Sequence, residues 1–436
     1  MTPTKKPYKG CRDFFPDEMR TRDFLFTQMR KTAELFAYEP YDGPLLEEIT
    51  LYKAKSGEEL INDQIYSFTD RGNREVAIRP EMTPTLARMV ANIHKQTAKP
   101  IRWYAIPNLM RYEKPQRGRV REHWQYNVDI FGAPVNLGEI EILSLIIHFL
   151  SSFGATQEMF SILLNDRRVV DGVFNKLLKL DNESSYKLYK VIDKAKKVSS
   201  EKLNEMISEV ITDEIRKNIF HKYLQLTNFE DLILFLEEHD LKDNCQDFIQ
   251  FTNMIKSLDL VDYLVYDPTI VRGLDYYTGI VFEIFDKHPD NNRAIAGGGA
   301  YANLLQIFNE NPLAGVGFGL GDVTLKDFLE THQLLGNFEK PSFDFALYCT
   351  DESNQLAAFE LGAKLRELNI KTEIHLGQIK FNKIIKTAEN KGYKKIGIIE
   401  LKDGNIQVQL KDLVNRVNGD AQITKPETIV NFLNQG

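Results

Sequence analysis

Cysteine is scarce in this sequence. The three cysteines, Cys11, Cys245 and Cys349, lie far apart, and none belongs to a CxxC pair. An odd number of widely separated cysteines argues against a disulfide framework. We therefore expect a reducing, cytoplasmic setting, and we predict no metal site.

Long apolar runs are also absent. The most apolar stretch, residues 141–153, is much shorter than the ~20 residues that cross a bilayer, and it contains His148. The lysine-rich N-terminal residues are not followed by an apolar segment, so no secretory signal is expected. The sequence thus predicts no membrane contact.

An excess of positive charge is missing as well. The 436 residues carry 55 lysines and arginines against 62 acidic residues, a net charge of −7. This balance argues against a polybasic DNA-binding protein, but RNA binding remains possible because local basic patches govern it. The length predicts two or three domains.

Glycine and proline are absent from residues 173–267. These residues commonly mark turns, so their absence favours long regular elements. Apolar residues in this region recur at intervals of three and four, as in Leu203, Met206, Ile207 and Val210. This spacing predicts amphipathic helices, which we place at about residues 168–264.

Short β-like segments flank this helical block on both sides. They alternate apolar and polar residues and are rich in aromatic residues, at residues 75–78, 101–106, 123–131, 279–285, 293–296 and 315–319. Two halves separated by a helical insertion must combine to complete one sheet. We therefore expect one α+β domain with an antiparallel sheet over residues 1–330.

The C-terminal part has a different pattern. A linker is expected at residues 331–341, followed by a second domain at residues 342–436. Expected strands at residues 343–349, 372–375 and 395–400 alternate with expected helices at 354–368 and 381–391. Such alternation predicts a small α/β domain with a mostly parallel sheet.

Glu81 and Thr83 lie where a strand ends and a helix over residues 84–93 is expected to begin. Both side chains could project into a site at this junction. The alternative is ordinary helix capping, with Thr83 as the N-cap and Pro84 at the first helical position.

An arginine-rich loop follows, between two β-like segments. It carries Arg111, Lys114, Arg117, Arg119 and Arg121. These cations repel one another unless an anion lies among them, and arginine forms bidentate bonds to phosphate. The alternative is a solvated charged hairpin.

Polar residues alternate with apolar ones in the strand after this loop. Gln125, Asn127 and Asp129 share one face, as expected for a lined pocket. Further along, glycines recur at residues 297–299 and 315–321. The run at 297–299 is by itself typical of a flexible turn. The alternation at 315–321 suits a strand that admits a flat group such as adenine, although it lacks the dinucleotide-binding and P-loop spacing.

Together these segments resemble the histidine–tRNA ligases, a family of class II aminoacyl-tRNA synthetases. Residues 9–16 are similar to the family's N-terminal signature, and residues 37–47 to the class II dimer motif. Residues 111–125 resemble the second class motif, and residues 272–277 resemble a signature particular to the histidine enzymes. The region from Phe343 is similar to the family's anticodon-binding domain.

The resemblance implies a site for L-histidine and a site for ATP. The histidine site would contain Glu81, Thr83, Gln125, Asp129, Tyr276, Tyr277 and Tyr301. The ATP site would contain Arg111, Glu113, Arg119, Arg121 and Arg272, of which Arg111 and Arg272 are the implied catalytic residues. Mg²⁺ is expected with the ATP phosphates, tRNA(His) as the second substrate, and a symmetric homodimer as the assembly.

Two departures from the family pattern leave an alternative open. Thr324 stands where the third class motif usually carries an arginine that contacts the γ-phosphate, and Ala300 and Ala302 replace a usual Arg and Asp. Lys114, Arg117 or Arg119 could compensate. The alternative is a catalytically silent relative that acts as a regulatory subunit of ATP phosphoribosyltransferase.

A basic patch is expected in the C-terminal domain. Residues 380–395 contain six lysines and a single acidic residue, Glu389. Lys383 and Lys386 lie three residues apart on the expected helix and can face the same way. They are candidate contacts for tRNA phosphates, and the alternative is an ordinary solvated helix.

Overall fold

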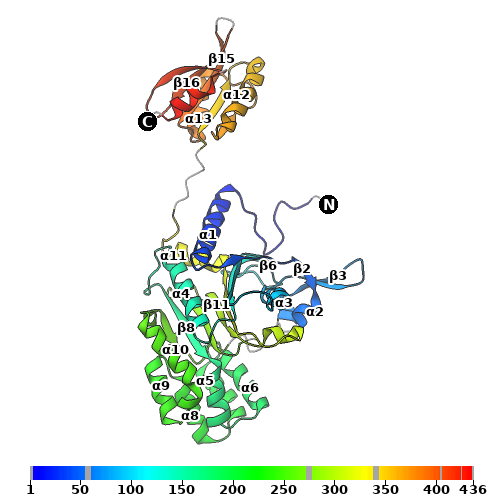
Figure 1. The fold of residues 1–436 in the computed structure, drawn as a ribbon, viewed down its shortest axis with the longest axis vertical. Coiled ribbons are helices and arrows are strands. Elements are labelled where there is room, and N and C mark those ends of the chain that lie inside the picture. The colour runs from blue at the N-terminus through cyan, green and yellow to red at the C-terminus, as the bar shows by residue number, and fades with distance from the viewer. Residues whose placement is uncertain are drawn as a thin grey trace. The chain divides into compact units, whose positions relative to one another are not determined.

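The computed structural model describes residues 3–54, 60–271, 277–336, 343–402, 405–423 and 425–434. The chain divides into two compact units, Met1–Gly336 and Asn337–Gly436. Each unit has its own sheet and its own hydrophobic core (Figure 1). Within the described residues, no helix is long and apolar enough to cross a membrane.

A nine-stranded sheet forms the centre of the first unit. Eight strands follow in the order β1 (Glu39–Pro40), β5 (Ile101–Ala105), β7 (Glu122–Phe131), β12 (Gly315–Gly321), β11 (Ala294–Tyr301), β10 (Ile280–Asp286), β8 (Phe160–Asp166) and β9 (Leu264–Tyr266). The ninth, β6 (Asn108–Met110), pairs with β7. All pairs from β5 to β8 are antiparallel, so the expected α+β fold with an antiparallel core is confirmed.

The two halves of the sequence meet between β7 and β12. Asn127 lies opposite Gly319, and Asp129 lies opposite Gly317. Without a side chain, Gly317 leaves room for the carboxylate beside it. A Cβ atom there would lie 2.1 Å from Asp129 Oδ1.

One face of the sheet is covered by α1 (Pro16–Leu35), α4 (Leu137–Ser151) and α11 (Asp322–Thr331). Tyr126, Val128 and Ile130 of β7 belong to the core on this face. Because side chains alternate along a strand, the odd-numbered residues of β7 point to the opposite face. The chain's most apolar stretch forms much of α4 and is buried in this core.

A small sheet and two helices accompany the central sheet. The small sheet has the order β2 (Leu46–Glu48), β4 (Glu75–Ile78), β3 (Tyr66–Thr69). The helices are α2 (Ile49–Lys53) and α3 (Thr83–Ile93), and α3 packs with Phe131 and Tyr301 in a separate cluster. This cluster fixes the start of α3 near the polar face of β7.

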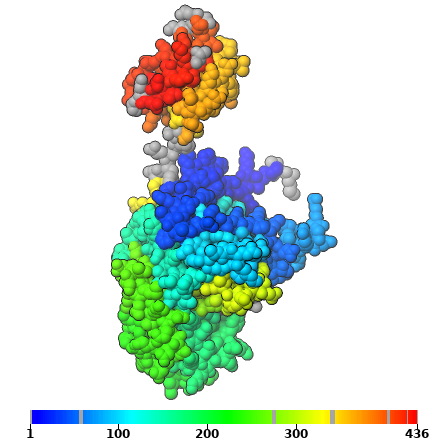
Figure 2. All heavy atoms as spheres, viewed as in Figure 1, coloured from blue at the N-terminus to red at the C-terminus, as the bar shows by residue number. Residues whose placement is uncertain are grey.

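The helical block connects β8 to the parallel strand β9. Its α-helices are α5 (Arg167–Asp171), α6 (Asn182–Asp193), α7 (Ser200–Val210), α8 (Glu214–Leu224), α9 (Phe229–Glu238) and α10 (Gln246–Ser257). Its core is continuous with that of the sheet, and the space-filling view shows the two parts in contact (Figure 2).

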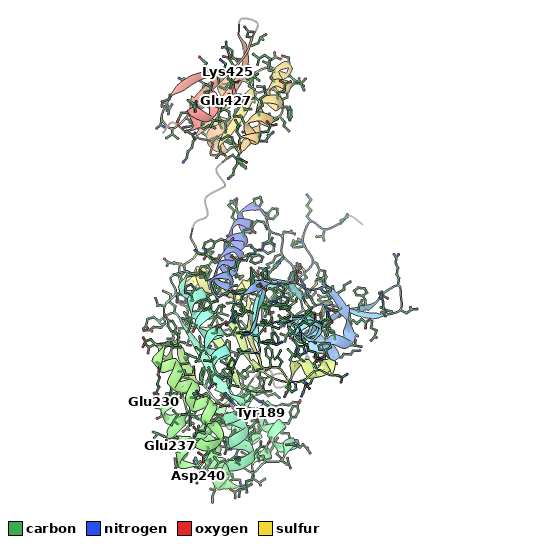
Figure 3. The ribbon with its side chains drawn as sticks, in the orientation of Figure 1. Tyr189, Glu230, Glu237, Asp240, Lys425 and Glu427 are labelled. Atoms are coloured by element: carbon green, nitrogen blue, oxygen red, sulfur yellow. The ribbon has the colours of Figure 1, made fainter. Side chains whose placement is uncertain are left out.

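From α6 onward, helix ends in this block are set without glycine or proline. The side chains of Asp181, Ser199 and Asp213 each accept a hydrogen bond from a backbone N–H in the first turn of the following helix. Asp240 and Asp259 follow the C-termini of α9 and α10 with φ of 54° in both cases, and Figure 3 labels Asp240. Aspartate tolerates this left-handed conformation better than most residues, so it replaces the usual terminal glycine.

The second unit contains a five-stranded sheet. Its order is β14 (Thr372–Ile374), β13 (Phe345–Cys349), β15 (Lys395–Lys402), β16 (Asn405–Asp412) and β17 (Asn418–Gln422), with helices α12 (Gln355–Glu367), α13 (Phe381–Asn390) and α14 (Pro426–Leu433). Two strand pairs are parallel and two are antiparallel, so the expectation of a mostly parallel sheet was wrong. Too few residues separate β15, β16 and β17 for the crossover helix that parallel pairing requires.

The glycine opposite Asp129 gives a stability prediction. In Gly317→Ala, the new Cβ would also lie 2.6 Å from the Val128 carbonyl oxygen, so the strands must shift. We expect a loss of about 1–3 kcal/mol, measured as a lower denaturant midpoint. Gly297→Ala is the matched control, because its nearest neighbouring atoms would lie 3.8 Å away. Equal losses in the two variants would contradict this explanation.

Candidate active site

Three cavities adjoin one another, and the innermost lies on the face of the sheet opposite α4, beside the polar side chains of β7. The inner cavity has a volume of about 140 Å³, the middle cavity about 470 Å³ and the outer cavity about 300 Å³. Arg111 and Gln125 line both the inner and the middle cavity. Arg293 and Thr324 line both the middle and the outer cavity, so the three lie in a row.

The inner cavity has a polar wall formed by one face of β7. Gln125, Asn127 and Asp129 all line it, as their alternation predicts. Asp129 is 6% exposed and accepts a hydrogen bond from the hydroxyl of Tyr301. Burial raises the pKa of the Asp129 carboxyl to about 7, although the Tyr301 hydrogen bond acts in the opposite direction.

Aromatic and helix-terminal residues complete the inner cavity. Tyr277 and Tyr301 both line it. Tyr277 can pack here because Gly299 lacks a side chain, whose Cβ would lie 2.7 Å from the tyrosine ring. Glu81 and Thr83 also line this cavity.

Thr83 does not cap α3. The helix begins at Thr83 itself, with Met82 as the N-cap residue and no side-chain capping hydrogen bond. The capping interpretation, with Pro84 at the first helical position, is therefore wrong by one residue. Thr83 remains available to the cavity.

The middle cavity is lined by charged residues from the arginine-rich loop. Arg111, Glu113 and Arg119 all contribute to it, and Arg119 forms an ion pair with Glu113. Arg111 Nε donates a hydrogen bond to the Pro80 carbonyl oxygen at 2.8 Å. This bond holds the guanidinium group where the inner and middle cavities meet.

The other cations of the loop lie elsewhere. Arg117 lines the outer cavity, and Lys114 is exposed. Arg121 is not among the described residues that line the middle cavity. Its guanidinium group lies over the rings of Tyr8 and Tyr112, and its Nε donates to the Glu113 carbonyl oxygen at 3.1 Å. Arg121 thus stabilises the loop through these contacts and does not line the middle cavity.

Three residues of the middle cavity, His123, Glu283 and Arg293, were not predicted from the sequence. His123 continues the alternation of Gln125, so that pattern could have revealed it. Glu283 is a buried acid within the apolar strand β10, which is itself a signal. No sequence pattern indicates Arg293, because the register between β10 and β11 shifts near its position.

His123 presents an uncharged ring to the middle cavity. Desolvation by the surrounding protein, together with the nearby positive charges of Arg111 and Arg12, lowers its pKa to about 3. The imidazole is therefore neutral at physiological pH. It adds a flat polar surface without adding charge.

Two predicted site residues, Arg272 and Tyr276, lie outside the described residues. Their neighbour Tyr277 is described and lines both the inner and the middle cavity.

The chain is similar to proteins of one family. Residues 10–323 match the histidyl-tRNA synthetase family. A histidine–tRNA ligase of Leptospira biflexa is 42% identical over 421 residues, which span 95% of this chain and 94% of that protein. One of Opitutus terrae is 35% identical and spans 97% of both chains.

Solved structures show the same fold. Histidyl-tRNA synthetase from Nostoc sp. PCC 7120 matches with a TM-score of 0.74 at 18% identity, over 99% of this chain and 100% of that chain. A Bacillus halodurans C protein described as an ATP phosphoribosyltransferase regulatory subunit/histidyl-tRNA synthetase also matches with a TM-score of 0.74, at 20% identity, over 91% and 99% of the two chains. The fold is therefore shared by proteins described in both ways.

The raised pKa of Asp129 gives a pH-dependent stability prediction. In the unfolded chain this carboxyl titrates near its ordinary value of 3.8, whereas in the folded chain it titrates at about 7. The folded state therefore holds an extra proton between these values, and the free energy of unfolding falls as pH rises through this window. A shift of this size corresponds to on the order of 4 kcal/mol.

Asp129→Asn removes this titration but keeps an oxygen that can accept the Tyr301 hydrogen bond. We expect its unfolding free energy to depend less on pH than that of the wild type between about pH 4 and 7. Urea denaturation across that range would measure the difference, since all other titrating groups are common to both proteins. If the unfolding free energies of the two proteins changed with pH in parallel, the raised pKa would not belong to Asp129.

Proposed function

The chain belongs to the histidyl-tRNA synthetase family and is an aminoacyl-tRNA ligase, and we propose that the row of cavities is where it activates L-histidine with ATP for transfer to tRNA(His). One observation carries this proposal: a buried polar cavity suited to a small amino acid opens directly onto an arginine-lined cavity suited to a nucleotide. Arg111 lies where the two meet.

The inner cavity binds histidine. The proposed contacts are Glu81, Thr83, Gln125, Asp129, Tyr276, Tyr277 and Tyr301. A substrate nitrogen donates a hydrogen bond to Asp129, which becomes charged as it gains this partner. Tyr277 and Tyr301 enclose the substrate ring. The substrate carboxylate then faces Arg111 and the middle cavity.

ATP occupies the middle cavity with its α-phosphate beside Arg111. An oxygen of the histidine carboxylate attacks the α-phosphorus, the bond to the β-phosphate oxygen breaks, and pyrophosphate leaves. Arg111 and Arg272 stabilise the charge that develops on the α-phosphoryl oxygens. No protein nucleophile is required, because the attacking carboxylate is already ionised.

The second step transfers histidine to tRNA(His). The 3′-hydroxyl of the terminal adenosine attacks the carbonyl carbon of histidyl-adenylate, and AMP leaves as the C–O bond to its phosphate breaks. Glu113 and Arg119 form the wall of the nucleotide cavity, and Arg121 positions this wall through its bond to the Glu113 carbonyl oxygen.

The middle cavity also fits Mg²⁺ bound with the ATP phosphates. Glu113 and Glu283 are the carboxylates among its described lining residues. Mg²⁺ in nucleotide sites typically uses one or two carboxylates together with phosphates and water. Across the described parts of the chain, no cluster of three His, Cys, Asp or Glu residues could form an all-protein metal site.

We also propose a symmetric homodimer formed through the segment of residues 37–47. Leu45 and Leu46 on this segment are 49% and 45% exposed. Strand β2, which begins at Leu46, pairs with β4 on one side and lies at an edge of its small sheet. An open sheet edge that begins with two exposed leucines is a suitable surface for a second copy.

Histidine-dependent exchange of labelled pyrophosphate into ATP tests activation directly. We expect the wild type to catalyse it, whereas a silent regulatory subunit would not. Asp129→Ala should raise the Michaelis constant for histidine by about 10- to 100-fold, because it removes a buried charged hydrogen-bond partner. Asp420→Ala, at an exposed position of the second unit, is the control. An unchanged Michaelis constant in Asp129→Ala would refute the assigned role.

The second unit is proposed to bind the anticodon region of tRNA through α13. Lys383 and Lys386 are exposed on this helix. Two other lysines of the basic segment serve the domain itself: Lys391 pairs with Glu373, and Lys395 donates to the carbonyl oxygens of Phe432 and Leu433. Lys380 and Lys394 are also exposed but flank the helix, so the phosphate contacts proposed for α13 itself depend on Lys383 and Lys386.

Changing Lys383 and Lys386 together to Glu should weaken tRNA(His) binding and flatten its salt dependence, because fewer counterions are released. The matched control changes Lys371 and Lys425 to Glu; both are exposed in the same unit and lie outside α13, and Figure 3 labels Lys425. Pyrophosphate exchange should be unchanged in both double variants. Equal weakening of tRNA binding by the two pairs would show that general charge, not the α13 patch, is responsible.

A further inference from the structure

The order of the cavities gives the bound nucleotide a direction. Arg111 lies at the inner end of the middle cavity, and Arg293 lies at its outer end, where the outer cavity begins. With the α-phosphate held beside Arg111, the rest of the nucleotide must extend away from the histidine cavity. The outer end is therefore a position for another nucleotide group.

Thr324 is poorly suited to bind phosphate at this outer end. Its hydroxyl lies 3.2 Å from the Ile295 carbonyl oxygen and 3.3 Å from the Gly321 carbonyl oxygen. A hydroxyl has one proton to donate, and here it is directed to backbone acceptors. Thr324 thus joins the start of α11 to β11 and contributes no positive charge.

The stem of Arg293 is held against the arginine-rich loop. Gly118 has a φ of 68°, and a Cβ atom there would lie 3.2 Å from Arg293 Cγ and 3.6 Å from Thr324 Cγ2. Three elements therefore converge at one point: the loop, the start of β11 and the first turn of α11. This packing fixes the position of the Arg293 stem where the middle and outer cavities meet.

Two other arginines, Arg117 and Arg119, lie near this end. Arg119 forms an ion pair with the buried Glu113. Arg117 Nη2 donates to Asn291 Oδ1 at 3.0 Å and lines only the outer cavity. Among the described arginines, Arg293 is the one that lines both the middle and the outer cavity.

We propose that Arg293 binds the β- and γ-phosphates of ATP, an inference that rests on the function proposed above. A guanidinium group binds phosphate oxygens with two parallel hydrogen bonds. At this position it neutralises charge on the triphosphate in the ground state and on pyrophosphate as it leaves. Arg293 therefore supplies the cation that Thr324 does not.

The test compares ATP with AMP, which lacks the β- and γ-phosphates. Arg293→Gln keeps the stem that packs against Gly118 but removes the charge. We expect it to raise the Michaelis constant for ATP in pyrophosphate exchange by about 10- to 100-fold. Inhibition by AMP and the Michaelis constant for histidine should be unchanged, and Arg293→Lys should recover part of the ATP affinity.

A second measurement uses the reaction after pyrophosphate has left. Transfer of histidine from preformed histidyl-adenylate to tRNA(His) should proceed at the wild-type rate in Arg293→Gln, because the adenylate has no β- or γ-phosphate. This result would also show that the variant is folded. Arg74→Gln is the charge control, since Arg74 is 67% exposed in the β3–β4 hairpin and pairs with Asp70.

Three results would overturn the proposal. If Arg293→Gln weakened the binding of ATP and of AMP equally, Arg293 would contact the adenosine part of the nucleotide. If Arg117→Gln lost affinity for ATP and Arg293→Gln did not, the β- and γ-phosphates would be bound by Arg117 instead. Slower transfer from the preformed adenylate in Arg293→Gln would indicate a general structural role. Absence of exchange in the wild type would instead contradict the proposed function.

Discussion

The architecture of the site depends on the antiparallel register between β7 and β12. This register places Asp129 opposite Gly317 and Asn127 opposite Gly319. With larger residues at the glycine positions, side chains would fill the space beside the polar face of β7. A shift of one residue would turn the polar face of β7 into the core under α4. The same pairing therefore determines the packing of the core and the opening of the inner cavity.

The buried carboxylate of Asp129 makes this arrangement costly without a ligand. A charge removed from water is unfavourable unless it has hydrogen-bond partners, and the Tyr301 hydroxyl supplies one. Burial nevertheless dominates, because the pKa of Asp129 remains well above its ordinary value. A ligand that donates a hydrogen bond, or carries positive charge, removes part of this cost when it binds. The cavity is thus selective for such ligands through a penalty already present in the free protein.

Sequence patterns predicted features that depend on local periodicity. The alternation of Gln125, Asn127 and Asp129 indicated one polar face, and the structure brings all three into one cavity. Features that depend on long-range packing were not predictable. Arg121 turns away from the cavity toward Tyr8, a contact between residues more than a hundred positions apart. Arg293 enters the site only through the convergence of three distant elements. In the C-terminal sheet, the alternating strands and helices that suggested parallel pairing end before β16 and β17.

The fold alone does not determine the chemistry, since similar folds occur in proteins described as synthetases and in one described also as a regulatory subunit. The residues that line the cavities are more informative about the chemistry. A protein that only sensed histidine would need the inner cavity, with Asp129 and its partners, but it would have no need for a second cavity lined by arginines. Here Arg111 joins the two cavities, and its Nε is anchored to the Pro80 carbonyl oxygen next to Glu81 of the inner cavity. The group that would hold a phosphate is therefore fixed to the same short segment that lines the inner cavity, the proposed amino-acid site. Such coupling suits a reaction between the two ligands, because it fixes the distance between the carboxylate and the phosphorus that it attacks.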